Sequence, residues 1–122
     1  MPRPRVLVVT DDAQTAERIR TILASEHYDV DTASRAAEAF DRFSRQHYDL
    51  MLTSIRLPDV DGPRLYWSLR ERWPSGYPRV IFLVPASTPT PGDLTGSEVA
   101  VLPVPVAPDV LREMVRHALG VF

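Results

Sequence analysis

The sequence predicts an α/β fold in which a parallel sheet is covered by helices on both faces. Short apolar runs rich in β-branched residues recur along the chain, and segments with helical periodicity follow them. The strands are apolar almost throughout, which is typical of strands buried on both faces. With 122 residues, 44% hydrophobic and 25% charged, we expect residues 1–122 to form a single globular domain.

The first two elements are a buried strand and an amphipathic helix. Residues 5–10 form a continuous β-branched run, which predicts a strand. Residues 13–26 carry apolar side chains at helical spacing on one face. Asp12 precedes this helix, and its carboxylate can cap it by accepting the free N–H groups of the first turn.

The middle of the chain predicts two further strand–helix pairs. Residues 28–33 alternate apolar and polar, as in a half-buried strand, and Ser34 is expected to cap a helix that continues to about residue 46. Residues 49–55 predict a second buried strand, and residues 57–62 have turn chemistry. Pro63 at a first helical position opens a helix over residues 64–73, and Pro74 ends it.

The last part of the chain predicts two strands that lack a full helix between them. The strands are expected at residues 79–84 and 99–104, and the final helix begins at Pro108 or Asp109 with Gly120 at its C-cap. Residues 85–98 contain three prolines and two glycines, which cannot sustain an amphipathic helix. We therefore expect a fourth helix that is shortened or missing, with at most one helical turn.

Composition excludes several classes of function. The chain has no cysteine, which excludes disulfides, thiolate catalysis and cysteine-bound metals. A net charge of −2 and a pI of 5.9 argue against nucleic-acid binding by this domain. The apolar runs are far too short to span a membrane, so we expect a cytoplasmic protein without membrane contact.

The residues that follow the strands are the candidates for chemistry. In an open parallel sheet, ligands bind beyond the carboxyl ends of the strands. Adjacent carboxylates there, here Asp11 and Asp12, can hold a divalent cation. The alternative is that Asp12 caps the helix while Asp11 is solvated, and spacing alone leaves both interpretations open.

Three runs of residues resemble the receiver domain of two-component response regulators over about residues 4–120. They are residues 6–12, residues 48–62 with the pattern I-R-x-P-x-x-D-G, and residues 101–106; the middle run is the most specific. The resemblance implies a flavodoxin-like sheet with strand order 2-1-3-4-5. It also implies an acidic pocket that accepts a phosphoryl group from a histidine kinase onto an aspartate, with Mg²⁺.

At most of the positions where the family has a reactive residue, the resemblance implies that this chain has a different one. The phosphoacceptor aspartate falls on Ser54, the metal-binding acidic pair on Thr10 and Asp11, the switch hydroxyl on Val84, the phosphoryl-binding lysine on Val104, and the aromatic switch on Val101. The chain contains no lysine at all, so that loss does not depend on the alignment. The resemblance also implies a cis peptide bond before Pro105.

These replacements predict a degenerate receiver, or pseudo-receiver, that is not an enzyme. A serine hydroxyl is a weak nucleophile without an adjacent base, and we expect no cofactor and weak or absent Mg²⁺ binding, with Asp11 as the candidate ligand that survives. The predicted function is a phosphorylation-independent protein–protein interaction module with a protein partner in a signalling pathway. The alternatives are a pseudo-receiver that binds a small apolar ligand in the relined pocket and a conventional Mg²⁺-dependent phospho-receiver.

We expect the contact surface of this module on helix 64–73 and the loop 85–98, together with Val101 of the final strand. The candidate residues are Tyr66, Trp67, Thr90, Asp93, Leu94 and Val101. Core packing is the alternative interpretation of the tryptophans, and we favour it for Trp73. The sequence leaves a homodimer open.

Overall fold

The computed structural model describes residues 3–86 and 100–120 and contains one five-stranded parallel sheet. The strands have the order β2-β1-β3-β4-β5, as the resemblance implied. They are β1 (Arg5–Val9), β2 (Asp29–Ala33), β3 (Leu50–Ser54), β4 (Arg79–Pro85) and β5 (Ala100–Val104). The predicted strands are confirmed, and no end differs from the prediction by more than one residue.

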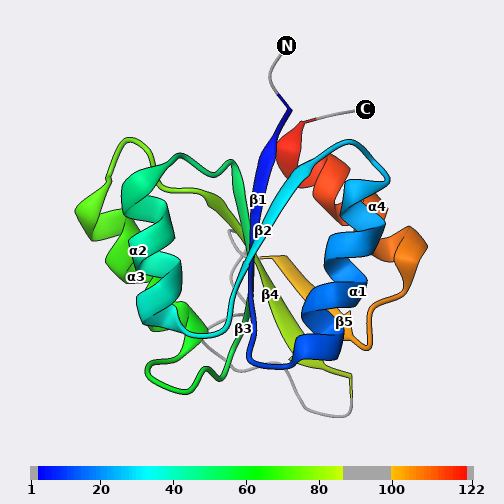
Figure 1. Ribbon diagram of the computed structural model, residues 1–122, viewed down its shortest axis with the longest axis horizontal. Coiled ribbons are helices and arrows are strands. Elements are labelled where there is room, and N and C mark those ends of the chain that lie inside the picture. The colour runs from blue at the N-terminus through cyan, green and yellow to red at the C-terminus, as the bar shows by residue number, and fades with distance from the viewer. Residues whose placement is uncertain (1–2, 87–99, 121–122) are drawn as a thin grey trace.

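Helices cover both faces of the sheet in the described residues. They are α1 (Ala13–Ala24), α2 (Ala36–Arg45), α3 (Gly62–Arg72) and α4 (Pro108–Leu119). Helices α1 and α4 lie on one face, and α2 and α3 lie on the other (Figure 1). No helix in the described part of the chain is both long and apolar enough to cross a bilayer.

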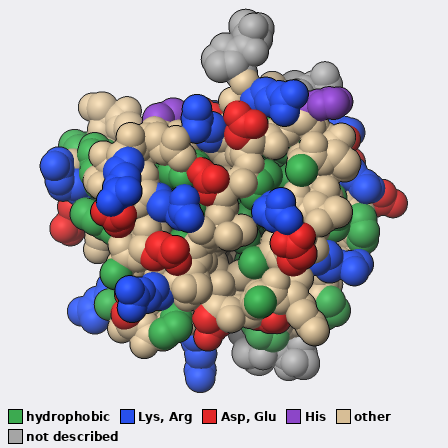
Figure 2. All heavy atoms as spheres, in the orientation of Figure 1, with side chains coloured by type: hydrophobic (Ala, Val, Ile, Leu, Met, Phe, Trp, Pro, Cys, Tyr) green, Lys and Arg blue, Asp and Glu red, His purple; other side chains and the backbone are tan. Residues whose placement is uncertain are grey.

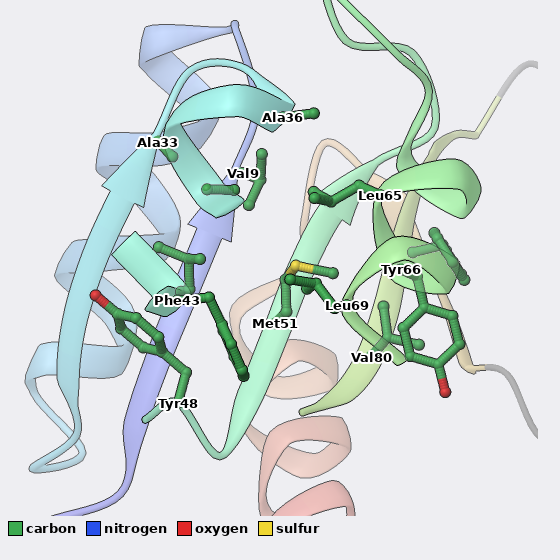
Figure 3. Packing of buried hydrophobic residues seen from close by; sticks show 13 residues of the cluster. Val9, Ala33, Ala36, Phe43, Tyr48, Met51, Leu65, Tyr66, Leu69 and Val80 are labelled. Atoms are coloured by element: carbon green, nitrogen blue, oxygen red, sulfur yellow. The ribbon is translucent and has the colours of Figure 1, made fainter. Parts of the chain in front are cut away.

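The sheet separates two hydrophobic clusters. Successive residues of β1 point to opposite faces, so Leu7 and Val9 join one cluster while Val6 and Val8 join the other. The cluster under α1 and α4 consists mostly of valine, isoleucine and leucine. The cluster under α2 and α3 contains most of the aromatic side chains (Figure 3), namely Phe43, Tyr48, Tyr66 and Phe82, with Phe40 and Trp73 packed against it.

The first two helices begin in different ways. Asp12 caps α1 as predicted, because its Oδ1 accepts the Gln14 N–H at 3.1 Å. The predicted Ser34 cap of α2 is wrong: the N-cap residue is Arg35, whose side chain makes no capping bond. Ser34 is instead held by Glu38, whose Oε1 accepts the Ser34 N–H at 2.7 Å.

The other helix ends are close to the prediction. Helix α3 begins at Gly62, earlier than predicted, because the Asp61 carboxylate caps it and accepts the Arg64 N–H at 2.8 Å. Helix α4 ends at Gly120, which has the left-handed backbone that favours glycine at a C-cap (φ 70°).

The end of the sheet at β5 contains the two prolines that the sequence singled out. Strand β5 lies at the edge, where Pro103 is exposed and its missing N–H costs no ladder bond. The Val104–Pro105 peptide bond is cis, as the resemblance implied. The predicted loss or shortening of the fourth helix falls on residues 87–98, which lie outside the described residues.

Candidate functional site

A pocket lies beyond the carboxyl ends of β1, β3 and β4. Its lining residues are Thr10, Asp11, Asp12, Thr15, Ser54, Ile55, Arg56, Leu83, Val84 and Pro85. The structure therefore brings together five of the predicted positions. Val104 and Pro105 line a neighbouring depression, which shares Asp12 and Thr15 with this pocket.

The two adjacent carboxylates at the end of β1 have different environments. Both oxygens of Asp12 accept hydrogen bonds, from the Gln14 N–H at 3.1 Å and the Thr15 hydroxyl at 2.8 Å. The Thr15 hydroxyl is the largest cause of the lowered pKa of Asp12. Asp11 is exposed, and its side chain makes no hydrogen bond or ion pair with the described residues. The capping interpretation of Asp12 is thus the one that the geometry supports.

Ser54 is the last residue of β3 and faces the pocket without a partner for its hydroxyl. Within the described residues its Oγ makes no hydrogen bond, while its backbone oxygen accepts the Thr53 hydroxyl at 3.1 Å. The lining of the pocket includes no histidine and, since the chain has none, no lysine. A serine without an adjacent base is a poor nucleophile, and no described residue is hydrogen-bonded to the Ser54 hydroxyl as a base would be.

The part of the lining that comes from β4 is hydrocarbon. Leu83 and Val84 are buried at the end of β4, while Val104, half-buried at the end of β5, lines the neighbouring depression. Valine offers neither a hydrogen bond nor a positive charge to an anion. These hydrocarbon side chains can contact an apolar group but cannot stabilise a phosphoryl oxygen, and the cationic side chain in the lining is Arg56.

The donor set of the pocket fits Mg²⁺ poorly. Magnesium is bound through near-octahedral oxygen ligands, usually carboxylates together with phosphate and water. Here Asp11 is the one lining carboxylate whose oxygens are not already engaged. Across residues 3–86 and 100–120, no group of three or more His, Cys, Asp or Glu side chains is close enough to hold a metal ion.

Asp59, in the loop between β3 and α3, has a structural role that the sequence pattern does not indicate. Its carboxylate caps α2 from across the fold by accepting the N–H groups of Ala36 at 2.9 Å and Ala37 at 2.8 Å. The hydrogen bond from Ala36 is the largest cause of its pKa, which is lowered to about 2. No local signal predicts this contact, because the partners lie more than 20 residues earlier in the chain.

The same loop approaches the pocket closely at Gly62. The Gly62 N–H donates to the Ile55 carbonyl at 2.7 Å. A Cβ at Gly62 would lie 2.2 Å from the Ser54 carbonyl oxygen, so only glycine fits this position. The loop and the end of β3 are therefore packed backbone against backbone.

The predicted contact surface is only partly exposed. Tyr66 is 8% exposed, so its prediction as a surface residue is wrong. Its ring shares the inward face of α3 with Leu65 and Leu69, and Figure 3 shows it beside Val80. Trp67 is 56% exposed. Trp73 packs against Phe40 and Phe43, as we favoured; Val101 is half-buried, and Thr90, Asp93 and Leu94 lie outside the described residues.

The fold and this pocket define a class of protein: an open, doubly wound α/β domain with its pocket where the strand order reverses between β1 and β3. The family model of the response regulator receiver domain matches residues 6–96. The chain belongs to this family.

Individual relatives agree with this assignment. The transcriptional regulatory protein GlrR of Escherichia coli (strain K12) is 30% identical over 115 residues, which are 93% of this chain and 26% of GlrR. The cell cycle transcriptional regulator CtrA of Caulobacter vibrioides is 38% identical over 66 residues, which are 54% of this chain and 29% of CtrA. The chain thus spans less than a third of the length of these curated relatives.

A solved structure supports the fold. A putative response regulator from Chloroflexus aurantiacus J-10-fl superimposes with a TM-score of 0.87 at 23% identity, covering 98% of this chain and 99% of that one. At this identity the likeness shows the fold alone.

Proposed function

We propose that this receiver domain is a pseudo-receiver, a phosphorylation-independent protein–protein interaction module of a two-component signalling pathway. The observation that carries the proposal is Ser54 at the end of β3, where the resemblance to the family places the phosphoacceptor aspartate. The absence of lysine from the whole sequence supports it independently. The proposed module binds a protein partner and catalyses no phosphoryl transfer.

The chemistry of acyl-phosphate formation supports this proposal. The reaction needs a carboxylate nucleophile, and the phosphoryl group brings about two negative charges that a metal ion and a cation must offset. Thr10, Ser54 and Val104 occupy the positions of two carboxylates and the ammonium group. With Asp11 as the remaining free carboxylate, we propose that Mg²⁺ binding is weak or absent and that no phosphoryl transfer occurs.

Treatment with a small-molecule phosphodonor tests the proposal. We expect the intact mass of the chain to stay unchanged after incubation with acetyl phosphate and Mg²⁺, while the receiver domain of CtrA, treated in parallel, serves as the control for the reagent. A gain of one phosphoryl group that is acid-stable and hydroxylamine-labile would show an acyl phosphate. That result would establish a conventional phospho-receiver instead.

A second candidate function is the binding of a small apolar ligand in the same pocket. Its observation is the hydrocarbon lining from Ile55, Leu83 and Val84 in a cavity of about 650 Å³, a volume within the usual range for small-molecule sites. A thermal-shift screen of small apolar compounds tests it. A compound that raises the Tm of the chain must no longer do so in Val84→Asp, which places a charge in the lining. A screen without such compounds would rule out this candidate function.

A further inference from the structure

Two exposed aromatic rings and an arginine form a patch at the outer face of α3 and the turn that follows it. We call Trp67, Arg70 and Tyr77 the aromatic–arginine patch. Trp67 is 56% exposed and Tyr77 is 37% exposed. The Arg70 Cζ atom lies 4.7 Å from the centroid of the Trp67 ring and 4.8 Å from that of the Tyr77 ring. The guanidinium thus lies within cation–π distance of both exposed rings.

A buried ring fixes this patch in place. Tyr66 is in the core, with its ring edge-on to Phe82 of β4 at 6.2 Å. The Trp67 and Tyr77 rings lie 5.9 and 6.2 Å from the Tyr66 ring, and Arg70 lies 5.7 Å from it. Because its parts rest on an anchored side chain, the patch loses little conformational entropy when it binds a partner.

The charge of this region is opposite to that of the chain. Residues 62–78 contain three arginines, Arg64, Arg70 and Arg72, and one acid, Glu71, although the whole chain has a net charge of −2. Within the described residues, none of the three arginines has a carboxylate within 4 Å. On the side of the molecule formed by α2 and α3, Figure 2 shows basic side chains (blue) beside hydrophobic ones (green), together with acidic side chains (red).

We propose that the aromatic–arginine patch binds an acidic segment of a partner protein that also carries apolar side chains. A guanidinium that lies over aromatic rings keeps N–H groups at its edge, and these match the two oxygens of a carboxylate. The exposed faces of Trp67 and Tyr77 supply contact area for the apolar side chains. The inference rests on the proposed role as an interaction module and names the chemistry of its partner.

The test uses a short fluorescein-labelled peptide of alternating glutamate and phenylalanine, with a glutamine-for-glutamate peptide as its uncharged match. Fluorescence anisotropy measures the Kd of each peptide for the full chain. We expect the glutamate peptide to bind at least about tenfold more tightly than the glutamine peptide, because charge-assisted hydrogen bonds are lost in the latter. We also expect binding of the glutamate peptide to weaken as salt is raised.

Variants separate the patch from general charge effects. R70Q and W67A are each expected to weaken the glutamate peptide about tenfold. R45Q removes an equal charge from exposed Arg45 of α2, which already pairs with Asp41 at 3.3 Å, and is expected to change the Kd by less than about twofold. Circular dichroism checks that each variant is folded.

The proposal would be overturned by no binding of the glutamate peptide, by equal binding of both peptides, or by equal losses in R70Q and R45Q. Self-association of the chain that W67A abolishes, without peptide binding, would also overturn it, because a second copy would then occupy the patch. None of these results bears on the phosphodonor experiment, so a failure of this inference is distinct from a failure of the proposed function.

Discussion

The loop between β3 and α3 and the pocket beside it lie at the same edge of the sheet but are used differently by the fold. In the loop, Asp59 caps α2, Asp61 caps α3, and Gly62 packs against the Ser54 carbonyl. In the pocket, Asp11 and the Ser54 hydroxyl make no hydrogen bond with the described residues. The loop residues are bonded or packed within the fold, whereas Asp11 and the Ser54 hydroxyl have no such partner among the described residues, so we expect these two pocket side chains to be replaceable with little loss of stability.

Because of this difference, the family's signature run over residues 48–62 indicates the fold but not phosphoryl chemistry. The run over residues 48–62 identifies the receiver domain because it specifies a strand, a turn and two helix caps. Each of those features is geometric. Phosphoryl chemistry depends on side chains that project from the ends of the strands, and those can be substituted independently of the loop.

The largest expected effect is that of Gly62→Ala in the loop. A Cβ 2.2 Å from a backbone oxygen requires the loop or β3 to move, and we expect unfolding to become easier by about 2 kcal/mol or more. Urea denaturation measures this change. Gly76→Ala is the matched control, because a Cβ there meets nothing within 4 Å; a similar loss in both variants would contradict the steric explanation.

The next largest effect is expected for Asp59→Ala. The folded pKa of Asp59 is about 2, below its ordinary value of 3.8, so its charged form stabilises the fold above about pH 4. This stabilisation is lost as the pH falls from about 4 towards 2. We expect a lower Tm for the variant at neutral pH and a difference from the wild type that shrinks over that pH range.

Asp41→Ala is the control for that measurement. Asp41 pairs only with exposed Arg45, among the described residues, and surface pairs contribute little. A Tm difference for Asp59→Ala that stays constant down to pH 2 would show that capping by the charged carboxylate is not the cause.

Restoring the family's reactive residues tests whether the pocket can regain phosphoryl chemistry while the loop stays unchanged. In the triple variant T10D/S54D/V104K the pocket regains two carboxylates and an ammonium group, and we expect its mass to rise by one phosphoryl group with acetyl phosphate and Mg²⁺. S54D alone is expected to react much less, because the charges of the phosphoryl group stay unbalanced. Equal reaction of the single and triple variants would show that the nucleophile alone was limiting.

The smallest effect is expected for Ser54→Ala. Since the Ser54 hydroxyl has no partner in the described residues, its removal should change the free energy of unfolding by less than about 0.5 kcal/mol. Urea denaturation beside Gly62→Ala tests the comparison directly. A large loss would mean that the pocket, like the loop, is required by the fold.

The strands and most helix starts could be predicted because their causes are local. The apolar runs that became β1, β3 and β4 needed only burial on both faces, and the caps by Asp12 and Asp61 involve neighbours in the chain. The start of α2 could not be predicted, because its cap comes from Asp59, across the fold. A nearby serine therefore looked like the better candidate.

The sequence predicted which residues meet in the pocket, but not the burial of Tyr66 or the contacts of Arg70. Strand ends in a parallel sheet meet at one edge, which is why Thr10, Asp11, Ser54 and Val84 were expected together. The burial of Tyr66 was missed because α3 turns a wide apolar stripe inward, and the stacking of Arg70 depends on Tyr77, a residue beyond the helix.

Because Asp59 caps α2, two backbone amides of that helix report on the position of the loop between β3 and α3. The N–H groups of Ala36 and Ala37 are bonded to this carboxylate, so their protection from solvent exchange depends on where residues 55–62 lie. In an NMR spectrum these two signals would report any displacement of that loop, such as one caused by a bound partner, without a label at the loop itself.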